Sequence, residues 1–126
     1  MVIYHSLRYS KIHLAVIKRS AIMTASERLQ KATDNIASRV AGKPPFRHKV
    51  KLILSDAGVV FVDGTADTNI VTNDDGPADL TMESTVAVMQ AIDSGELDPF
   101  SAFMQGKLSI EGDQGLAAAF GTLIEK

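Results

Sequence analysis

The chain has 126 residues, no cysteine and a formal net charge of −2 at pH 7, which is enough for one domain with one core. The lack of cysteine excludes disulfides and thiol chemistry, and no apolar run reaches the roughly 18 residues of a membrane span. Residues 1–51 hold eleven of the 13 Lys and Arg residues, and 52–106 hold none. This uneven distribution of basic residues has two interpretations. The basic residues lie on ordinary solvated surfaces, or they form a basic face that contacts anionic lipid or an anionic ligand head group.

Residues 1–22 carry four basic residues and no acid. We expect an extension there, either disordered or upstream of a natural start at Met23. An organelle-targeting transit peptide is the competing interpretation, because such peptides are basic and poor in acids. The expected domain therefore spans residues 23–126.

A helix is predicted to begin at the capping-box pair Thr24 and Glu27 and to end at Gly42. Its apolar residues share one face: Leu29, Ala32, Ile36 and Val40. Turn-forming sequences then separate four predicted strands, at 46–54, 59–62, 68–72 and 78–82. We expect these strands to form a meander, with 59–62 buried on both faces. A helix capped by Ser84 follows and ends at Gly95.

The segment from Asp98 to Phe120 contains three predicted elements in close succession. Asp98 and Pro99 are typical of a helix start, and the apolar face of that helix consists of Phe100, Phe103 and Met104. Residues 107–111 alternate as a strand does. Asp113 can cap a last helix, whose apolar stripe is Leu116, Phe120 and Leu123. The expected fold class is α+β, with a five-stranded, mostly antiparallel sheet and helices on one face.

No catalytic or metal site is predicted, and no cofactor. The three histidines are scattered, and exposed strand histidine is the interpretation of His48. The Asp74-Asp75 pair stands before Gly76-Pro77, which is typical of a solvated turn. No nucleophile elbow or phosphate-binding loop occurs. A nucleic-acid partner is not expected either, because no basic run is interleaved with aromatic residues.

Residues 103–117 closely resemble the signature of the sterol carrier protein type 2 domain family. The matching features are Phe103, Gly106-Lys107, an alternating strand, Gly112-Asp113 and Gly115-Leu116-Ala117. Upstream, residues 95–99 match as well, and the resemblance extends over residues 25–124. It implies a lipid-binding domain in which the sheet and helices enclose an apolar tunnel.

The resemblance also implies which residues line the tunnel. By spacing alone these apolar residues fit an ordinary core. With the resemblance, the expected ligand-binding residues are Phe103, Met104, Gln105, Leu116 and Phe120, with Met82 and Met89 added because methionine lines adaptable sites. Gln105 is the polar exception, and we expect it either to hold the polar end of the ligand or to satisfy backbone groups where the short helix ends.

The function that the resemblance implies is binding and transfer of sterol-like, fatty-acyl, acyl-CoA or phospholipid molecules by a non-enzymatic monomer in transient contact with membranes. The alternative is an accessory or scaffold protein that holds an isoprenoid or lipid intermediate for partner enzymes. A third interpretation is a tunnel domain that serves catalysis as part of a larger enzyme. The sequence shows no fusion partner, which counts against this interpretation. Glu125-Lys126 is not a peroxisomal signal, and a cytoplasmic location is expected.

Overall fold

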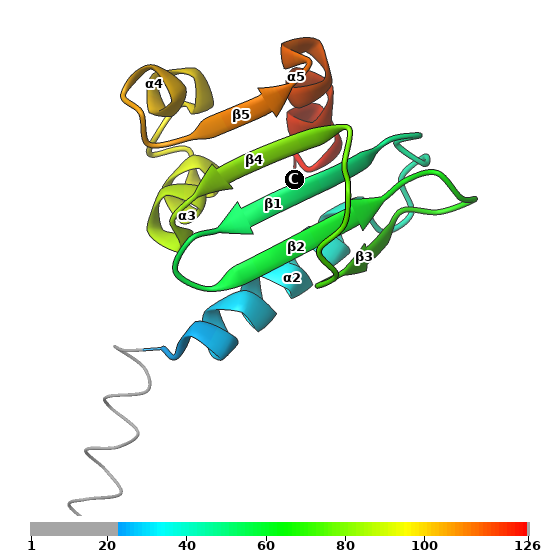
Figure 1. The fold of residues 1–126 in the computed structure, drawn as a ribbon, viewed down its shortest axis with the longest axis horizontal. Helices are drawn as coiled ribbons and strands as arrows, with labels where there is room; N and C mark the ends of the chain where they lie inside the picture. Colours follow the sequence, from blue (N-terminus) through cyan, green and yellow to red (C-terminus); the bar gives the residue numbers. More distant parts are fainter. Residues whose placement is uncertain (1–22, 126) are drawn as a thin grey trace, which may run out of the picture.

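A computed structural model describes residues 23–125 of the chain, so the expectation for residues 1–22 lies outside the described residues. In chain order the elements are α2 (Ala25–Val40), β1 (Lys49–Leu54), β2 (Gly58–Asp63), β3 (Ile70–Thr72), β4 (Leu80–Ser84), α3 (Val86–Ser94), α4 (Pro99–Met104), β5 (Ser109–Gly112) and α5 (Gln114–Leu123). Figure 1 shows these elements around one sheet. The α+β fold class is therefore confirmed.

The predicted meander of four strands is wrong. The strand order is β3-β2-β1-β4-β5, and β4 pairs with β1 in parallel, while the other neighbouring pairs are antiparallel. A parallel neighbour requires a crossover connection. Residues 73–79 provide it: in Figure 1 they cross in front of β2 and β1, on the face opposite to α2 and α5.

Polar contacts hold this crossover in place. The Lys49 N–H donates to the Asp79 carboxylate at 2.9 Å, and the Asp79 N–H donates to the Lys49 carbonyl at 2.9 Å. Lys51 Nζ lies 2.8 Å from Asp75 Oδ1. The crossover also lies against Phe61, since a Cβ on Gly76 would be 3.9 Å from the Phe61 ring. The predicted burial of the second strand on both faces is thereby confirmed, because Phe61 is buried here and Val60 and Val62 are buried on the helix side.

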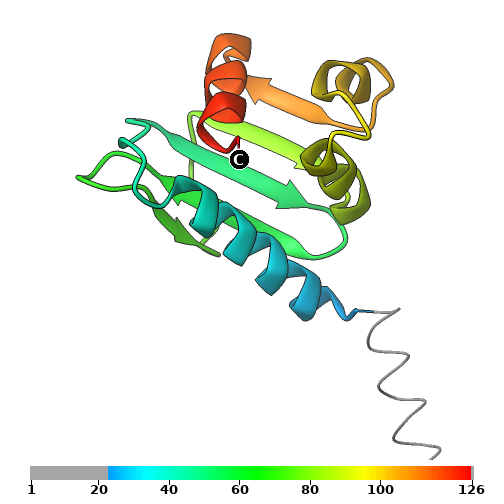
Figure 2. The same ribbon diagram turned by 180° about the vertical axis from the view of Figure 1, so that it is seen from behind.

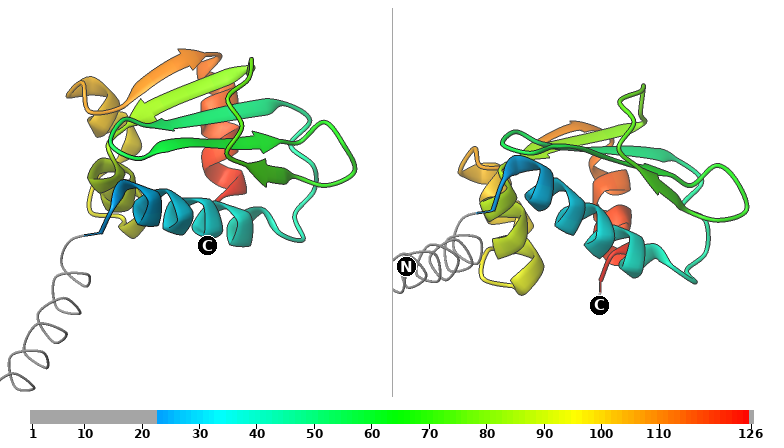
Figure 3. Two further views of the ribbon diagram at one scale, coloured as in Figure 1. Left: turned by 60° about the horizontal axis from the view of Figure 1, so that its bottom comes forward. Right: turned by 90° about the horizontal axis from the view of Figure 1, so that it is seen from below.

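The helices pack on one face of the sheet, as predicted. Figure 2 and the right-hand view of Figure 3 show α2, α3 and α5 on the same side. The alternation of β1 puts three apolar side chains into this layer, and its burial alternates along the whole strand. The buried core between sheet and helices consists of Ile36, Val40, Val50, Leu52, Leu54, Val60, Val62, Leu80, Val86 and Phe120.

The residues that cap the helices are those predicted from the sequence, with one exception. Thr24 and Glu27 form the complete capping box, and Asp98 and Asp113 cap α4 and α5. The residue that caps α3 is Thr85 rather than Ser84. Ser84 is the last residue of β4 and is buried, so it belongs to the sheet.

Two backbone features set where strands begin and end. Arg47 has a φ of 70°, a left-handed conformation that interrupts an extended chain, so β1 begins at Lys49 rather than at residue 46. Gly112 has a φ of 121°, and a Cβ there would lie 2.6 Å from the Asp79 carbonyl oxygen. Only glycine fits this close approach at the end of β5.

Candidate functional site

An apolar groove lies between the sheet and the helices α2 and α3, and the segment after α5 closes one part of it. Its volume is about 650 Å³, counted with the open space at its mouth. The lining comes from four elements and the C-terminal segment: Arg28, Lys31, Ala32, Asn35, Ile36, Arg39, Leu52, Leu54, Val60, Val86, Met89, Gln90, Ile92, Asp93 and Ile124. The space inside it that a water-sized sphere can occupy is only about 70 Å³, so the groove is narrow compared with the roughly 300–1,000 Å³ of typical small-molecule sites.

Ordinary periodicities place the apolar lining. Ala32 and Ile36 are one helical turn apart on α2, and Leu52 and Leu54 are alternate residues of β1. On α3, Val86, Met89 and Ile92 follow each other at intervals of three residues, which puts them on one face of the helix. The floor is therefore β-sheet, and the walls are the facing sides of two helices.

The polar residues of the groove lie at its edges. Arg28, Lys31, Asn35 and Arg39 stand along α2, and Gln90 and Asp93 come from α3. Arg39 forms an ion pair with Asp93, and its guanidinium also donates to the Ile124 carbonyl. One arginine of α2 thus connects α3 and the segment after α5 at this part of the groove.

Arg28 connects the beginning of α2 to the turn between β1 and β2. One of its terminal nitrogens donates to the carbonyl of Met23 and the other to the carbonyl of Asp56. The Asp56 carboxylate, in turn, accepts the N–H of Val86 at the start of α3. This part of the groove is therefore also fixed by polar contacts between three segments.

Of the seven predicted ligand-binding residues, Met89 lines this groove and the other six do not. Phe120 is fully buried, and its ring meets the Phe46 ring edge to face at a centroid distance of 5.5 Å. Met82 and Leu116 are half-buried against the core. Phe103 is half-buried, whereas Gln105 is exposed and Met104 is 67% exposed. For all seven residues, contact with a ligand stays a prediction.

The residues that sequence reasoning missed lie mainly on α2 and α3, and the others lie on β1, on β2 and after α5. Their apolar members have the spacing of an ordinary core, so no local pattern separates a groove wall from a packed interior. A signal was available on α2, where Arg28, Lys31, Asn35 and Arg39 form a polar stripe beside the apolar face. Such a stripe is equally typical of a solvated helix flank.

Residues 23–125 contain no group of three or more His, Asp or Glu side chains placed to hold a metal ion. The Thr65 hydroxyl and N–H donate to Asp63 and lower the pKa of that carboxyl, but Asp63 is the last residue of β2 and does not line the groove. Among the helices of this region, none has both the length and the apolar character that a membrane crossing requires.

Known structures share this fold. Sterol carrier protein 2 like 2 from Aedes aegypti is 23% identical, covers 77% of this chain and 96% of its own, and superposes with a TM-score of 0.61. Sterol carrier protein domain 2 of Helicoverpa armigera is 21% identical over 76% of this chain and 84% of its own, with a TM-score of 0.64. Aedes aegypti sterol carrier protein 2, solved with palmitate, is 20% identical. It covers 82% of this chain and 96% of its own, with a TM-score of 0.61.

Identities below 25% establish a common fold and nothing finer. No curated protein matches this sequence significantly. The model of the SCP-2 sterol transfer family, however, matches residues 16–125, which is most of the chain. On the strength of that match, the chain belongs to the SCP-2 sterol transfer family.

Proposed function

We propose that this protein binds a lipid molecule in the groove between α2, α3 and the sheet, and transfers it between membranes. The observation that carries the proposal is the groove itself, whose floor and walls are apolar side chains from β1, β2, α2 and α3. Membership in a sterol transfer family supports lipid as the class of ligand. The chemistry is binding and release, without a covalent step.

The driving force is removal of ligand hydrocarbon from water, at about 0.8 kcal/mol per CH₂ group. Ten buried CH₂ groups would supply about 8 kcal/mol, which corresponds to micromolar binding before the cost of association is subtracted. The groove follows α2 from Arg28 to Arg39, which is about 16 Å at 1.5 Å per residue. One leaflet of a bilayer has a hydrocarbon thickness of roughly 15 Å, so the length of the groove matches that of one extended acyl chain.

The proposed ligands are sterol-like, fatty-acyl or phospholipid molecules, of which an acyl chain fits the length of the groove best. A related structure, the Aedes aegypti protein, was solved with palmitate, and this supports the fatty-acyl choice. Met89 adds a flexible, polarizable wall that can adapt to chains of different shape.

The test is displacement of a fluorescent fatty-acid analogue from the purified full-length protein. We expect saturable micromolar or tighter binding that long-chain lipids compete and short-chain acids do not. Transfer is tested by mixing labelled donor vesicles with unlabelled acceptor vesicles, where the protein should raise the rate of lipid exchange. Failure of every lipid to compete would contradict the proposal.

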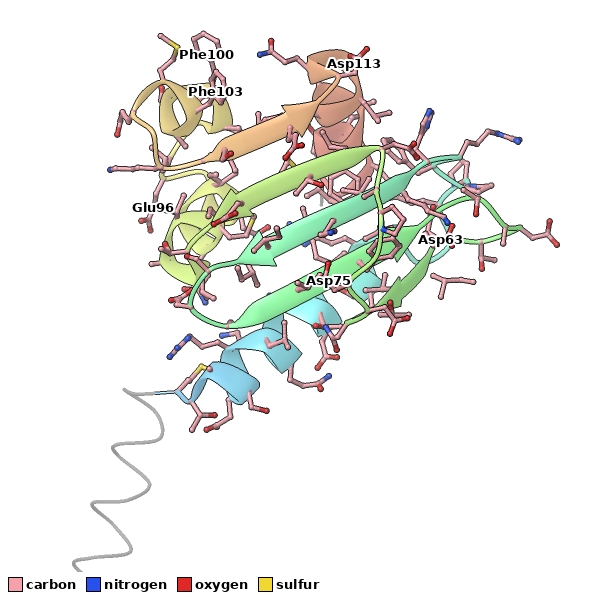
Figure 4. All side chains as sticks on the ribbon, in the orientation of Figure 1. Asp63, Asp75, Glu96, Phe100, Phe103 and Asp113 are labelled. Atoms are coloured by element: carbon pink, nitrogen blue, oxygen red, sulfur yellow. The ribbon has the colours of Figure 1, made fainter. Side chains whose placement is uncertain are left out.

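A second candidate, a scaffold that holds a lipid intermediate for partner enzymes, is favoured by one observation. On α4, Phe100 is 70% exposed and Met104 is 67% exposed, and Figure 4 shows Phe100 extending from that helix away from the sheet. Exposed apolar side chains of this kind are typical of contact surfaces. Replacing both by serine should leave lipid binding intact and abolish co-purification with a lipid-processing enzyme if the scaffold role is correct.

A further inference from the structure

The groove is too narrow in this structure to enclose the acyl chain that its length matches. The space inside it that a water-sized sphere can occupy is about 70 Å³, and one water molecule takes about 10–15 Å³ of such space. This is room for about five water molecules, whereas micromolar binding needs burial of roughly ten carbons. One wall of the groove must therefore move outward before a lipid tail can be buried in it.

The wall that α3 provides is fixed firmly at its start. Thr85 alone separates α3 from β4. Val86 is buried, and its N–H donates to the Asp56 carboxylate at 2.9 Å. The guanidinium of Arg28, on α2, donates to the Asp56 carbonyl at 2.8 Å. The first turn of α3 is thus attached to the sheet, to the turn between β1 and β2 and, through Asp56, to α2.

The other end of α3 is attached less firmly. Met89 packs against the core, but Ile92, one residue before Asp93, lines the groove and is only half-buried. Among residues 23–125, the polar contacts that join this half of α3 to another element are those of Asp93 with Arg39 on α2. The hydrogen bond from Arg39 Nη2 to Asp93 Oδ2 is 2.8 Å long. The C-terminal half of α3 is therefore held to α2 mainly by one ion pair.

The segment after α5, which closes another part of the groove, is held by two cations. Arg39 donates to the Ile124 carbonyl at 3.4 Å, and Lys43 donates to the Glu125 carbonyl at 2.8 Å. If Arg39 lets go of this segment, Lys43 still holds it. The C-terminal half of α3 is therefore the wall that can move most easily.

We propose that the C-terminal half of α3 moves away from α2 to admit a lipid tail, and that the Arg39–Asp93 ion pair is the latch that holds it closed. This rests on the proposed function, to which it adds the route of entry and the residues that set its rate. The tail enters sideways between the two helices, past the exposed side chains of Asn35 and Gln90. Because the latch acts on the empty and the filled groove alike, weakening it speeds both entry and release.

The first experiment measures both rates by stopped flow for Asp93→Asn, with a pyrene-labelled long-chain alcohol as an uncharged probe. We expect both rate constants to rise by about two- to fivefold, the value of a partly exposed ion pair, with a smaller change in Kd. Salt screens such pairs, so it should raise both rates in the wild type and not in Asp93→Asn. Asp75→Asn is the matched control, because it breaks the ion pair to Lys51 on the opposite face of the sheet and should keep wild-type rates.

The second experiment closes the latch covalently. The native chain has no cysteine, so the double variant Arg39→Cys/Asp93→Cys has two unique thiols that a short bismaleimide can bridge. The bridged protein should take up and release the probe about tenfold or more slowly than the same variant with both thiols blocked by a monomaleimide. Hydrogen exchange without lipid adds a readout of the movement itself: amides of residues 89–92 should exchange faster in Asp93→Asn than in the wild type, and those of β1 should not.

The outcomes separate the latch from lipid binding. Wild-type rates in folded Asp93→Asn, or equal rates in the bridged and the blocked double variant, would overturn the latch and leave lipid binding in place. Unchanged hydrogen exchange of residues 89–92 in Asp93→Asn would also overturn it. Absence of probe binding by the wild type, with no lipid competing for the groove, would instead contradict the proposed function itself.

Discussion

The groove and the segment from α4 to α5 contain similar apolar residues in different surroundings. In the groove, Met89 and Ile92 face an apolar space that extends along α2. In the segment from α4 to α5, Ala102 and Phe120 are buried against packed neighbours, while Phe100 and Met104 face solvent. In this structure, the segment that is easiest to recognise in the sequence supplies buried core and exposed side chains, and the groove is lined mainly by other elements.

The difference follows from how each region is built. The α4–β5–α5 segment contains caps and glycines that must occur at fixed positions, such as Asp98, Asp113 and Gly112. The groove is lined by alternating strand residues and by helix faces, and such periodic patterns occur in many sequences. Caps and glycines that the backbone requires at fixed positions can be recognised in a sequence. An open space between packed elements leaves no such pattern.

The largest expected effect is that of Phe120→Ala. Because Phe120 is fully buried and packs on Phe46, the substitution should cost about 3–5 kcal/mol in the free energy of unfolding. Chemical denaturation of the full chain measures this cost. A loss below about 1 kcal/mol combined with an altered lipid preference would instead make Phe120 a wall of the ligand site, as the sequence predicted.

A smaller effect is expected for Arg39→Gln. The substitution removes the ion pair to Asp93 and the contact with the Ile124 carbonyl, which should cost about 1 kcal/mol, since the pair is partly exposed. The dissociation rate of a bound lipid should rise because α3 is then held less firmly to α2. Stopped-flow release measures this rate, and Lys51→Gln, which breaks the pair to Asp75, should leave it unchanged.

The smallest effect is expected for Gln105→Leu. Gln105 is exposed after α4, and its N–H donates to the Ser101 carbonyl, a bond that leucine can also make. Stability should therefore change by no more than about 0.5 kcal/mol, and the affinities for fatty acid and alcohol should both stay constant. Selective loss of affinity for lipids with a polar head would show that Gln105 holds that head, as the alternative expectation states.

Much of the fold was predictable because local chemistry fixes it. The capping box at Thr24, the alternation of β1 and the caps Asp98 and Asp113 were all placed correctly from the sequence. The position of β4 beside β1 was not predictable, because it depends on pairing between residues far apart, such as Lys49 and Asp79. A turn sequence marks where a strand ends but does not specify which neighbour the next strand takes.

The candidate site was less predictable for a related reason. Met89, which was predicted because methionine suits adaptable sites, lines the groove, whereas Leu52, Val60 and Ile36 have the burial pattern of any core. Whether two packed elements leave space between them depends on side-chain sizes on both. That information is distributed over α2, β1, β2 and α3, and no single segment contains it.

The most direct test of the central claim, that lipid binds in the groove, compares Met89→Trp with Met104→Trp. The native chain has no tryptophan, so each introduced indole is a unique fluorescent reporter as well as a bulky substitution. We predict that Met89→Trp weakens binding of a long-chain fatty acid about tenfold or more, by occupying the groove, and that its emission shifts when ligand is added. Met104→Trp should keep wild-type affinity and constant emission. The reverse result, with binding lost and emission shifted only in Met104→Trp, would contradict the account.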